Sequence, residues 1–246
     1  MAIGPDLTKR VALVTGGSRG IGRSIALALA EAGADIAVNF RERAGPAEET
    51  AAAARAIGRR ALAVAADVSD SEPVLNMVRL IEMELGPIDV LVNNAGIALQ
   101  RGLDDLDEAD FDRTIAVNLK SAFLCTKAVL PGMRARGWGR IVNISSGAAR
   151  GSGVVGVHYN ASKAGLEGLT RGYAARLVKD GITVNAVAPS LIDTEMTQAH
   201  HGDVTKKVLL GRLGTPDEVA QAVLMAVGNG YMTGQTIAVN GGRHFN

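Results

Sequence analysis

The chain has 246 residues, of which 47% are hydrophobic and 21% charged, with a formal net charge of +1. This composition can build a sizeable core and excludes a disordered chain, and without a basic stripe nucleic acid is a poor partner. No apolar run approaches the roughly 18 residues of a membrane span, the first residues lack a secretory signal, and the single cysteine, Cys125, excludes an internal disulfide. We therefore expect a cytoplasmic protein that contacts neither membrane nor nucleic acid.

The first predicted element is a buried strand over 11–15, which runs directly into the glycine-rich turn GGSRGIG at 16–22. Apolar residues at helical spacing then predict a helix that ends at Gly33. Strand, glycine turn and helix are the context of a phosphate-binding loop, because the backbone can approach a pyrophosphate and the helix N-terminus offers free N–H groups. The residues of this turn expected to contact a dinucleotide are Gly16, Ser18, Arg19, Gly20, Ile21 and Gly22.

The second predicted strand, 35–39, ends beside residues that bear on the choice between NAD and NADP. Folds that prefer NAD usually place a carboxylate there to bind the ribose hydroxyls. This chain has Asn39, with Arg41 two residues later and Arg19 in the glycine turn. A guanidinium can bind a 2′-phosphate in bidentate fashion, whereas a carboxylate would repel it. We expect NADP(H) to be preferred and NAD(H) to be possible; Glu42 nearby, and the alternative of solvated surface arginines, keep the question open.

The rest of the chain repeats this alternation. Strands are expected over 61–65, 88–92, 140–144, 182–187 and 235–239, and helices over 46–57, 74–85, 107–135, 158–179 and from 216 onward. Residues 190–215 lack periodicity, and 190–208 are expected to form a substrate lid. The pattern predicts one doubly wound Rossmann-type α/β domain over 1–246, with a seven-stranded, mainly parallel sheet and helices on both faces. Its ligand should bind beyond the carboxyl ends of the strands.

Tyr159 and Lys163 are four residues apart on a predicted helix, so they share one face, one turn apart. A phenol titrates near pH ~10, and a neighbouring ammonium favours the phenolate and lowers that pKa. Such a pair can exchange a proton with a carbonyl or alcohol oxygen. An isolated Tyr-x-x-x-Lys is more often an ordinary surface pair, so the assignment depends on the motifs around it.

Several further motifs occur in one order. They are Thr15-Gly16 with Gly20 and Gly22, Asp67, NNAG at 93–96, Asn118, Ser146, YNASK at 159–163 and the segment 189–194. With these motifs, the sequence resembles the short-chain dehydrogenase/reductase family over essentially its whole length, and most of all the 3-oxoacyl-(acyl carrier protein) reductases. Ser190 departs from the pattern, because the family commonly has glycine there, so the contacts expected from 190–194 depend on the local backbone.

The resemblance implies a role for each motif residue. Ser146 would donate a hydrogen bond to the substrate carbonyl, and Tyr159 would transfer the proton. Lys163 would lower the pKa of Tyr159 and bind the nicotinamide ribose, and Asn118 would hold a water that joins Lys163 to solvent. Besides Tyr159 and Lys163, the further cofactor contacts implied are Asp67, Val68, Asn94, Ala95, Gly96, Pro189, Ile192 and Thr194.

The resemblance also implies hydride transfer between a nicotinamide and a carbonyl or secondary alcohol, with 3-oxoacyl-(acyl carrier protein) reductase as the most specific expectation. Two alternatives stay open: a dehydrogenase or reductase of a small polyol, sugar or other secondary alcohol, and a non-catalytic cofactor-binding regulator, although such regulators typically lose the Tyr or the Lys. The expected partners are a small carbonyl, alcohol or acyl thioester substrate and, by family analogy, further copies of the chain in a homotetramer.

No metal is expected, because His200 and His201 are adjacent and do not make a full ligand set. An acidic carrier protein would need exposed cations near the active site. The family's cation positions hold Gly137 and Asp180 in this chain, and Arg134, Arg136 and Lys179 are the neighbouring candidates.

Overall fold

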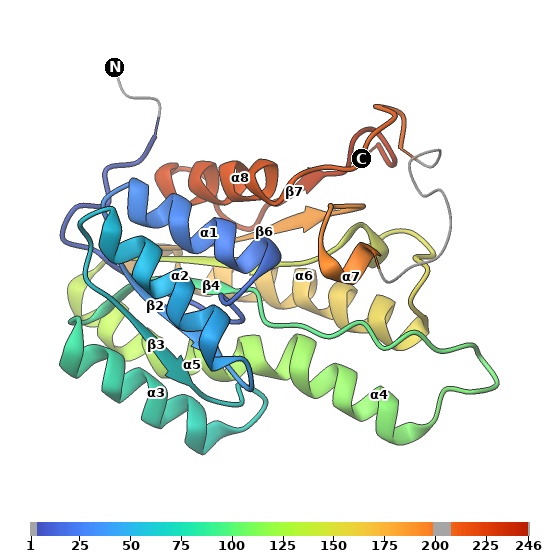
Figure 1. Ribbon diagram of the computed structural model, residues 1–246, viewed down its shortest axis with the longest axis horizontal. Helices are drawn as coiled ribbons and strands as arrows, with labels where there is room; N and C mark the ends of the chain where they lie inside the picture. Colours follow the sequence, from blue (N-terminus) through green and yellow to red (C-terminus); the bar gives the residue numbers. More distant parts are fainter. Residues whose placement is uncertain (1–3, 199–207, 246) are drawn as a thin grey trace.

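The computed structural model describes residues 4–198 and 208–245. Its centre is one seven-stranded sheet in the order β3-β2-β1-β4-β5-β6-β7, in which every pairing is parallel (Figure 1). The strands are β1 Val11–Val14, β2 Asp35–Phe40, β3 Ala61–Ala65, β4 Ile88–Asn93, β5 Gly139–Ile144, β6 Ile182–Pro189 and β7 Thr236–Val239. The predicted doubly wound sheet is confirmed.

Helices cover both faces of this sheet (Figure 1). They are α1 Gly20–Glu31, α2 Ala44–Ala56, α3 Ser71–Glu84, α4 Glu108–Ile115, α5 Ser121–Arg136, α6 Val157–Leu177, α7 Glu195–Gln198 and α8 Pro216–Gly228. α1, α2 and α8 pack on one face, and α3, α5 and α6 pack on the other. Strand order reverses between β1 and β4, so a ligand is expected beyond the carboxyl ends of these strands.

Two apolar layers form the core, one on each face of the sheet. Small side chains such as Ala26 and Ala51 are fully buried under α1 and α2, so these helices lie close to the strands. On the other face Met133 and Leu177 belong to the layer that also contains Leu91 of β4 and Ile141 of β5. Cys125 belongs to this second layer, and burial raises the pKa of its thiol to about 12, which fits a structural thiol. Within the described residues, no helix combines the length and hydropathy needed to cross a bilayer.

The long helix expected over 107–135 is interrupted. α4 ends at Ile115, a π-helical segment follows over Ala116–Lys120, and α5 begins at Ser121. A single wider turn leaves the apolar pattern on either side unchanged, so periodicity could not reveal it. The π-helical segment contains Asn118, and it therefore bears directly on the site.

The segment after β6 is also more ordered than its sequence indicated. It contains the short helix α7 and a bridge between Ile192 and Gly214. α7 lies on the side toward which the arrowheads of β6 and β7 point (Figure 1). Much of the lid predicted over 190–208, with His200 and His201, falls at 199–207, outside the described residues.

Candidate active site

The turn after β1 has backbone positions that favour glycine. Gly16 and Gly20 have φ angles of +62° and +51°, and a Cβ on Gly22 would lie 2.3 Å from the Gly16 carbonyl oxygen. α1 begins here without a side-chain cap or an acidic residue in its first turn, so its first N–H groups remain available to an anion. Ile21 lies in this turn of helix, and Ser18 is buried beneath the loop. A dinucleotide pyrophosphate fits this cradle.

The NNAG turn after β4 is fastened to the glycine turn. The Asn94 side-chain amide donates to the carbonyls of Thr15 (2.9 Å) and Gly16 (3.0 Å). The Thr15 hydroxyl in turn accepts from the N–H groups of Asn94 and Ala95, both at 3.0 Å. A Cβ on Gly96 would lie 3.3 Å from Asn118 Oδ1. The turn therefore joins the predicted cofactor loop to the predicted catalytic residues.

Asn39 is placed differently from its prediction. It is only 2% exposed, its Oδ1 accepts from the Gly16 N–H at 3.3 Å, and its Nδ2 donates to the Ala66 carbonyl at 3.1 Å. The side chain thus supports the glycine turn from β2 and is not free to contact a ribose hydroxyl. Strand spacing places a residue at the strand end but cannot show which way its amide turns. Arg41 is therefore the residue at this strand end that is predicted to distinguish NADP from NAD.

Asp67 and Val68 follow β3 at the same end of the sheet. Burial raises the pKa of Asp67, but hydrogen bonds from the Ser69 hydroxyl and N–H, with the charges of Arg41 and Arg113, hold it below its usual value. Arg41 Nη1 lies 3.8 Å from Asp67 Oδ2. Asp67 is therefore a charged acceptor beside the predicted adenine position, with Val68 buried next to it.

Two residues that the sequence did not single out lie above the glycine turn. Glu195, at the start of α7, forms an ion pair with Arg19, and Arg43 Nη1 lies 3.4 Å from the same Glu195 Oε2. Thr194 precedes Glu195, and its Cγ2 lies 3.5 Å from where a Cβ on Gly20 would be. The segment after β6 therefore returns over the cofactor loop, and only long-range contacts of this kind could have identified Glu195.

The remaining residues predicted in this segment are held by the fold. Pro189 ends β6, where it pairs with Val239 of β7. Ile192 is 3% exposed and packs in the core layer under α8, which leaves its backbone as the part that can face a cofactor. Ser190 occupies the position where the family commonly has glycine, and its hydroxyl accepts from Arg243 Nη1 at 3.4 Å.

Ser146, Tyr159 and Lys163 come together between β5 and α6. Ser146 is the second residue after the end of β5, and its hydroxyl is hydrogen-bonded to that of Tyr159. Lys163 Nζ lies 5.8 Å from the centroid of the Tyr159 ring and donates to the Ile144 carbonyl at 2.8 Å. The structure thus brings the predicted catalytic residues together at the carboxyl edge of the sheet, beside the cofactor loop.

The pKa values of this pair differ from the sequence-based expectation. Burial raises the pKa of Tyr159, and the hydrogen bond with Ser146 lowers it only in part. Burial also lowers the pKa of Lys163 to about 8. The expected lowering of the Tyr159 pKa by Lys163 is not seen, because the ammonium bonds to the Ile144 carbonyl and its own charged form is disfavoured. Burial of this kind is not visible in a four-residue spacing.

Asn118 is 1% exposed within the π-helical segment. Its Oδ1 accepts from the Ile97 N–H at 2.8 Å, and its Nδ2 donates to the Ile97 carbonyl at 3.0 Å and to Ser162 Oγ at 3.1 Å. The side chain therefore fastens the loop after β4 to the helix that carries Tyr159 and Lys163. The water expected between Asn118 and Lys163 stays a prediction.

Glu167, one turn beyond Lys163, was not predicted to contribute. It is 5% exposed, it accepts from Ser145 Oγ at 3.3 Å, and its Oε2 lies 3.1 Å from Arg150 Nε. Because Ser145 and Arg150 flank Ser146 in the chain, Glu167 holds the Ser146 segment against α6. The repeated four-residue step from Tyr159 to Lys163 to Glu167 was a signal that could have found it.

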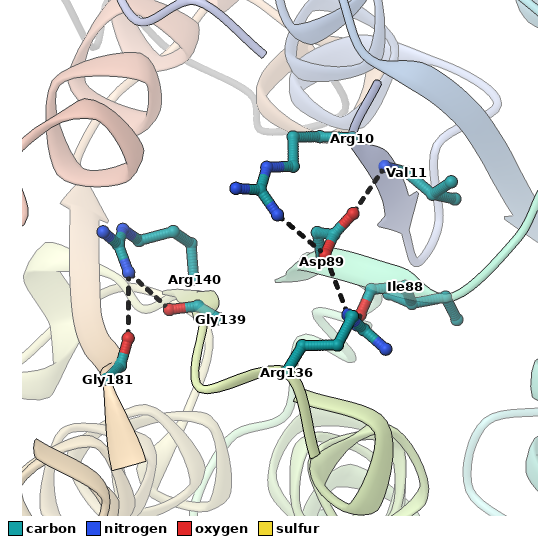
Figure 2. Close-up of polar contacts among 8 residues, drawn as sticks. All are labelled: Arg10, Val11, Ile88, Asp89, Arg136, Gly139, Arg140 and Gly181. Atoms are coloured by element: carbon teal, nitrogen blue, oxygen red, sulfur yellow. Dashed lines mark hydrogen bonds and ion pairs between the residues drawn. The ribbon is translucent and has the colours of Figure 1, made fainter. Parts of the chain in front are cut away.

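The cations considered for carrier docking lie at the opposite edge of the sheet. Arg134 Nε is 2.8 Å from Asp180 Oδ2, and Arg136 Nε is 3.3 Å from Asp89 Oδ1. Like Lys179, they lie at the amino ends of β4, β5 and β6, and Figure 2 shows Arg136 beside Asp89 at this edge. These candidate cations therefore do not line the mouth of this chain's own site, because residues that precede a strand lie at the end away from its ligand. In the part of the chain that the structure describes, no three His, Cys, Asp or Glu side chains are grouped to hold a metal.

Comparison with known proteins agrees with this geometry. The family model for short chain dehydrogenases matches residues 10–204. The chain belongs to the short-chain dehydrogenase/reductase family. A solved structure described as a short-chain alcohol dehydrogenase from Sinorhizobium meliloti superposes with a TM-score of 0.92 at 40% identity, over 97% of each chain.

Relatives of this family member cover its whole fold. It is 42% identical to nodulation protein G of Azospirillum brasilense, over 97% of this chain and 100% of the relative. It is 40% identical to acetoacetyl-CoA reductase of Allochromatium vinosum (95% and 98% covered). It is also 42% identical to 3-oxoacyl-[acyl-carrier-protein] reductase of Staphylococcus aureus (95% and 97% covered). The protein is therefore an oxidoreductase of CH–OH or carbonyl groups in a family that binds nicotinamide cofactors, and the predicted similarity to 3-oxoacyl-(acyl carrier protein) reductases is confirmed.

Proposed function

We propose that this short-chain dehydrogenase/reductase is an NADP(H)-dependent reductase of 3-oxoacyl thioesters. The observation that carries the proposal is the arrangement of Ser146, Tyr159 and Lys163 at the carboxyl edge, next to a glycine turn that fits a pyrophosphate. When bound, the nicotinamide supplies the hydride. The protein supplies the position of the carbonyl and the proton.

The hydroxyls of Ser146 and Tyr159 converge, so together they can bind one carbonyl oxygen of a substrate. Because burial raises the pKa of Tyr159, its phenol is protonated at neutral pH and is set to donate. As the carbonyl oxygen gains negative charge, the phenol transfers its proton to that oxygen. Lys163, with a pKa of about 8, is mostly an ammonium at pH 7 and stabilises the phenolate that remains. The protonated phenol is the form that carbonyl reduction requires.

Two kinds of observation support the finer assignments. Arg19, Arg41 and Arg43 gather at the adenosine end of the predicted cofactor site, which favours a 2′-phosphate. Two of the relatives are named as reductases of acetoacetyl-CoA and of a 3-oxoacyl carrier protein, both of which are 3-oxoacyl thioesters. A cytoplasmic homotetramer is part of the proposal.

The second candidate is a dehydrogenase or reductase of a small polyol, sugar or other secondary alcohol, favoured by the likeness to a structure described as an alcohol dehydrogenase. A non-catalytic regulator is less well supported, because Asn118, Ser146, Tyr159 and Lys163 are all in place.

The test follows the absorbance of reduced nicotinamide in purified protein, with acetoacetyl-CoA, ethyl acetoacetate and a panel of polyols, each with NADP(H) and NAD(H). We expect reduction of acetoacetyl-CoA with NADPH to have the highest kcat/KM. Faster oxidation of a polyol would favour the second candidate, and no turnover of any substrate would favour the regulator. Light scattering on the same sample tests the tetramer.

A further inference from the structure

Glu195 occupies two of the arginines that surround the proposed 2′-phosphate position. We propose that Glu195 is an intramolecular competitor of the NADP(H) 2′-phosphate, and that it limits how strongly the enzyme prefers NADP(H) over NAD(H). This inference rests on the proposed cofactor site. It assigns a specificity-determining role to Glu195 and adds Arg43 to the residues that would bind the phosphate.

The geometry places one carboxylate oxygen between two guanidinium groups. Glu195 Oε2 pairs with Arg19 Nη1 and lies 3.4 Å from Arg43 Nη1. Arg19 comes from the glycine turn, Arg43 directly precedes α2, and Glu195 begins α7. These segments are far apart in the sequence, so their convergence on one anionic oxygen marks a position that favours an anion. A phosphate oxygen has the same preference for a guanidinium fork.

Carboxylates already pair with the guanidinium groups around this position before any ligand binds. Three guanidinium groups and three carboxylates take part in the ion pairs: Arg19, Arg41, Arg43, Glu42, Asp67 and Glu195. A phosphate monoester brings a further charge of about −1.5 to −2. The phosphate would therefore compete with these carboxylates for the guanidinium groups.

Glu195 is the carboxylate that can leave with the least disturbance. Asp67 is fixed by Ser69, and Glu42 is the chain neighbour of Arg41 and moves with it. Glu195 lies on a separate short helix, and its side chain is 63% exposed. Exposed ion pairs contribute little stability, so a phosphate can displace this one. Because NAD(H) lacks the phosphate, it gains nothing from the displacement.

The same ion pairs could instead act as a clasp over the bound cofactor. The two roles make opposite predictions. A competitor opposes only ligands that carry the 2′-phosphate, whereas a clasp strengthens the binding of NADPH and NADH alike.

The test measures Kd for NADPH, NADH and adenosine 2′,5′-bisphosphate, which carries the phosphate but no nicotinamide, in the wild type and Glu195→Gln. We expect Glu195→Gln to tighten NADPH and the bisphosphate by roughly three- to tenfold and to change NADH less than about twofold. The gain should shrink as salt rises. Glu48→Gln is the matched control, because it removes the same charge from an ion pair with Arg55 elsewhere on α2.

A second comparison uses Arg43→Gln. In that background Glu195→Gln should tighten NADPH clearly less than it does in the wild type, because one of the two guanidinium groups it frees is missing. Unchanged NADPH affinity in Glu195→Gln, or equal weakening of NADPH and NADH, would overturn the proposal. A wild type that prefers NADH would contradict the proposed cofactor, yet a selective gain for NADPH in Glu195→Gln would still support this role.

Discussion

Both edges of the sheet hold buried charged groups, but only the amino edge pairs its buried charge with groups of opposite charge. At the amino edge, Asp89 is 4% exposed; its carboxylate lies 3.3 Å from both Arg10 and Arg136 and accepts from the Val11 N–H at 3.2 Å (Figure 2). At the carboxyl edge, Lys163 is 5% exposed, and among the described residues it has no carboxylate partner, only the Ile144 carbonyl.

The difference separates a structural cluster from a reactive one. The Asp89 charge is compensated, and the amino edge also holds Arg10 and Arg140 over the Trp138 ring at 3.9 and 4.4 Å. The Lys163 charge is not compensated, so burial lowers its pKa to about 8. A buried group with a shifted pKa beside a phosphate-binding turn indicates a functional site, whereas a larger number of paired charges does not.

The largest effect is expected for Tyr159→Phe. The change keeps the ring but removes the hydroxyl that bonds to Ser146 and would donate the proton. General acid catalysis typically contributes about 10²–10⁴-fold, so kcat should fall by that amount while NADPH still binds. Steady-state rates and a cofactor titration on one preparation measure both. Near-normal turnover would show that another group transfers the proton.

The next effect concerns stability against pH. An unfolded lysine titrates near pH ~10.4, whereas buried Lys163 titrates at about 8. Between these values the unfolded chain binds more protons at this side chain, so the contribution of Lys163 to the free energy of unfolding of the cofactor-free protein should rise with pH, by up to roughly 3 kcal/mol. The raised pKa of Cys125 acts in the opposite direction in the upper part of this range, so the contribution is read from the difference between variants. Urea unfolding at several pH values measures it. Lys163→Met should lose this rise, whereas Lys127→Met, at an exposed position, should keep it. If the unfolding free energy changed with pH by the same amount in both variants, the lowered pKa of Lys163 would be contradicted.

Asp89→Asn breaks the compensated cluster at the amino edge. Removing one partner of a buried ion pair is strongly destabilising, but the Arg10 and Arg136 side chains are 35% and 28% exposed and can turn to water. We therefore expect a loss of about 2 kcal/mol in unfolding free energy, with kcat of the folded enzyme unchanged. Denaturant unfolding measures the stability, and initial rates at low temperature measure kcat. A large drop in kcat would contradict the view that the two edges act separately.

A smaller effect is expected for Arg41→Asp, at the adenosine end of the carboxyl edge. It replaces a phosphate partner by a repelling charge, so the ratio of kcat/KM for NADPH over NADH should fall at least tenfold, about 1.4 kcal/mol. The glycine turn is untouched, and NADH kinetics serve as the internal control. A wild type that already prefers NADH would show that Arg41 does not select the cofactor.

The smallest effect is expected for Asp180→Arg. This change breaks the exposed pair with Arg134 at the amino edge. Rim charges act mainly on association with charged partners, and this one is remote from Tyr159 in its own chain. The kcat/KM for acetoacetyl-CoA should therefore stay within about twofold of the wild type. A larger change would place Asp180 near an active site, for instance that of a neighbouring copy in a tetramer.

The sequence predicted the fold well, and it singled out residues that the structure brings together at one site, because both depend on local patterns. Alternating apolar segments predicted the parallel sheet, and the fixed spacing of Ser146, Tyr159 and Lys163 on adjoining elements predicted that these three side chains lie together. Properties that depend on burial and on long-range contacts were not predictable. They include the inward amide of Asn39, the direction of the Tyr159 pKa and the convergence of Arg43 with Glu195.

We infer that the carboxyl edge of this sheet carries out the reaction and that the charged cluster at the amino edge stabilises the fold. The most direct measurement compares kcat for acetoacetyl-CoA with the unfolding free energy in the wild type, Tyr159→Phe and Asp89→Asn under the same conditions. We expect that Tyr159→Phe loses turnover and keeps its stability, while Asp89→Asn loses stability and keeps its turnover. If Asp89→Asn lost turnover while folded, or Tyr159→Phe retained it, the contrast between the two edges would be contradicted.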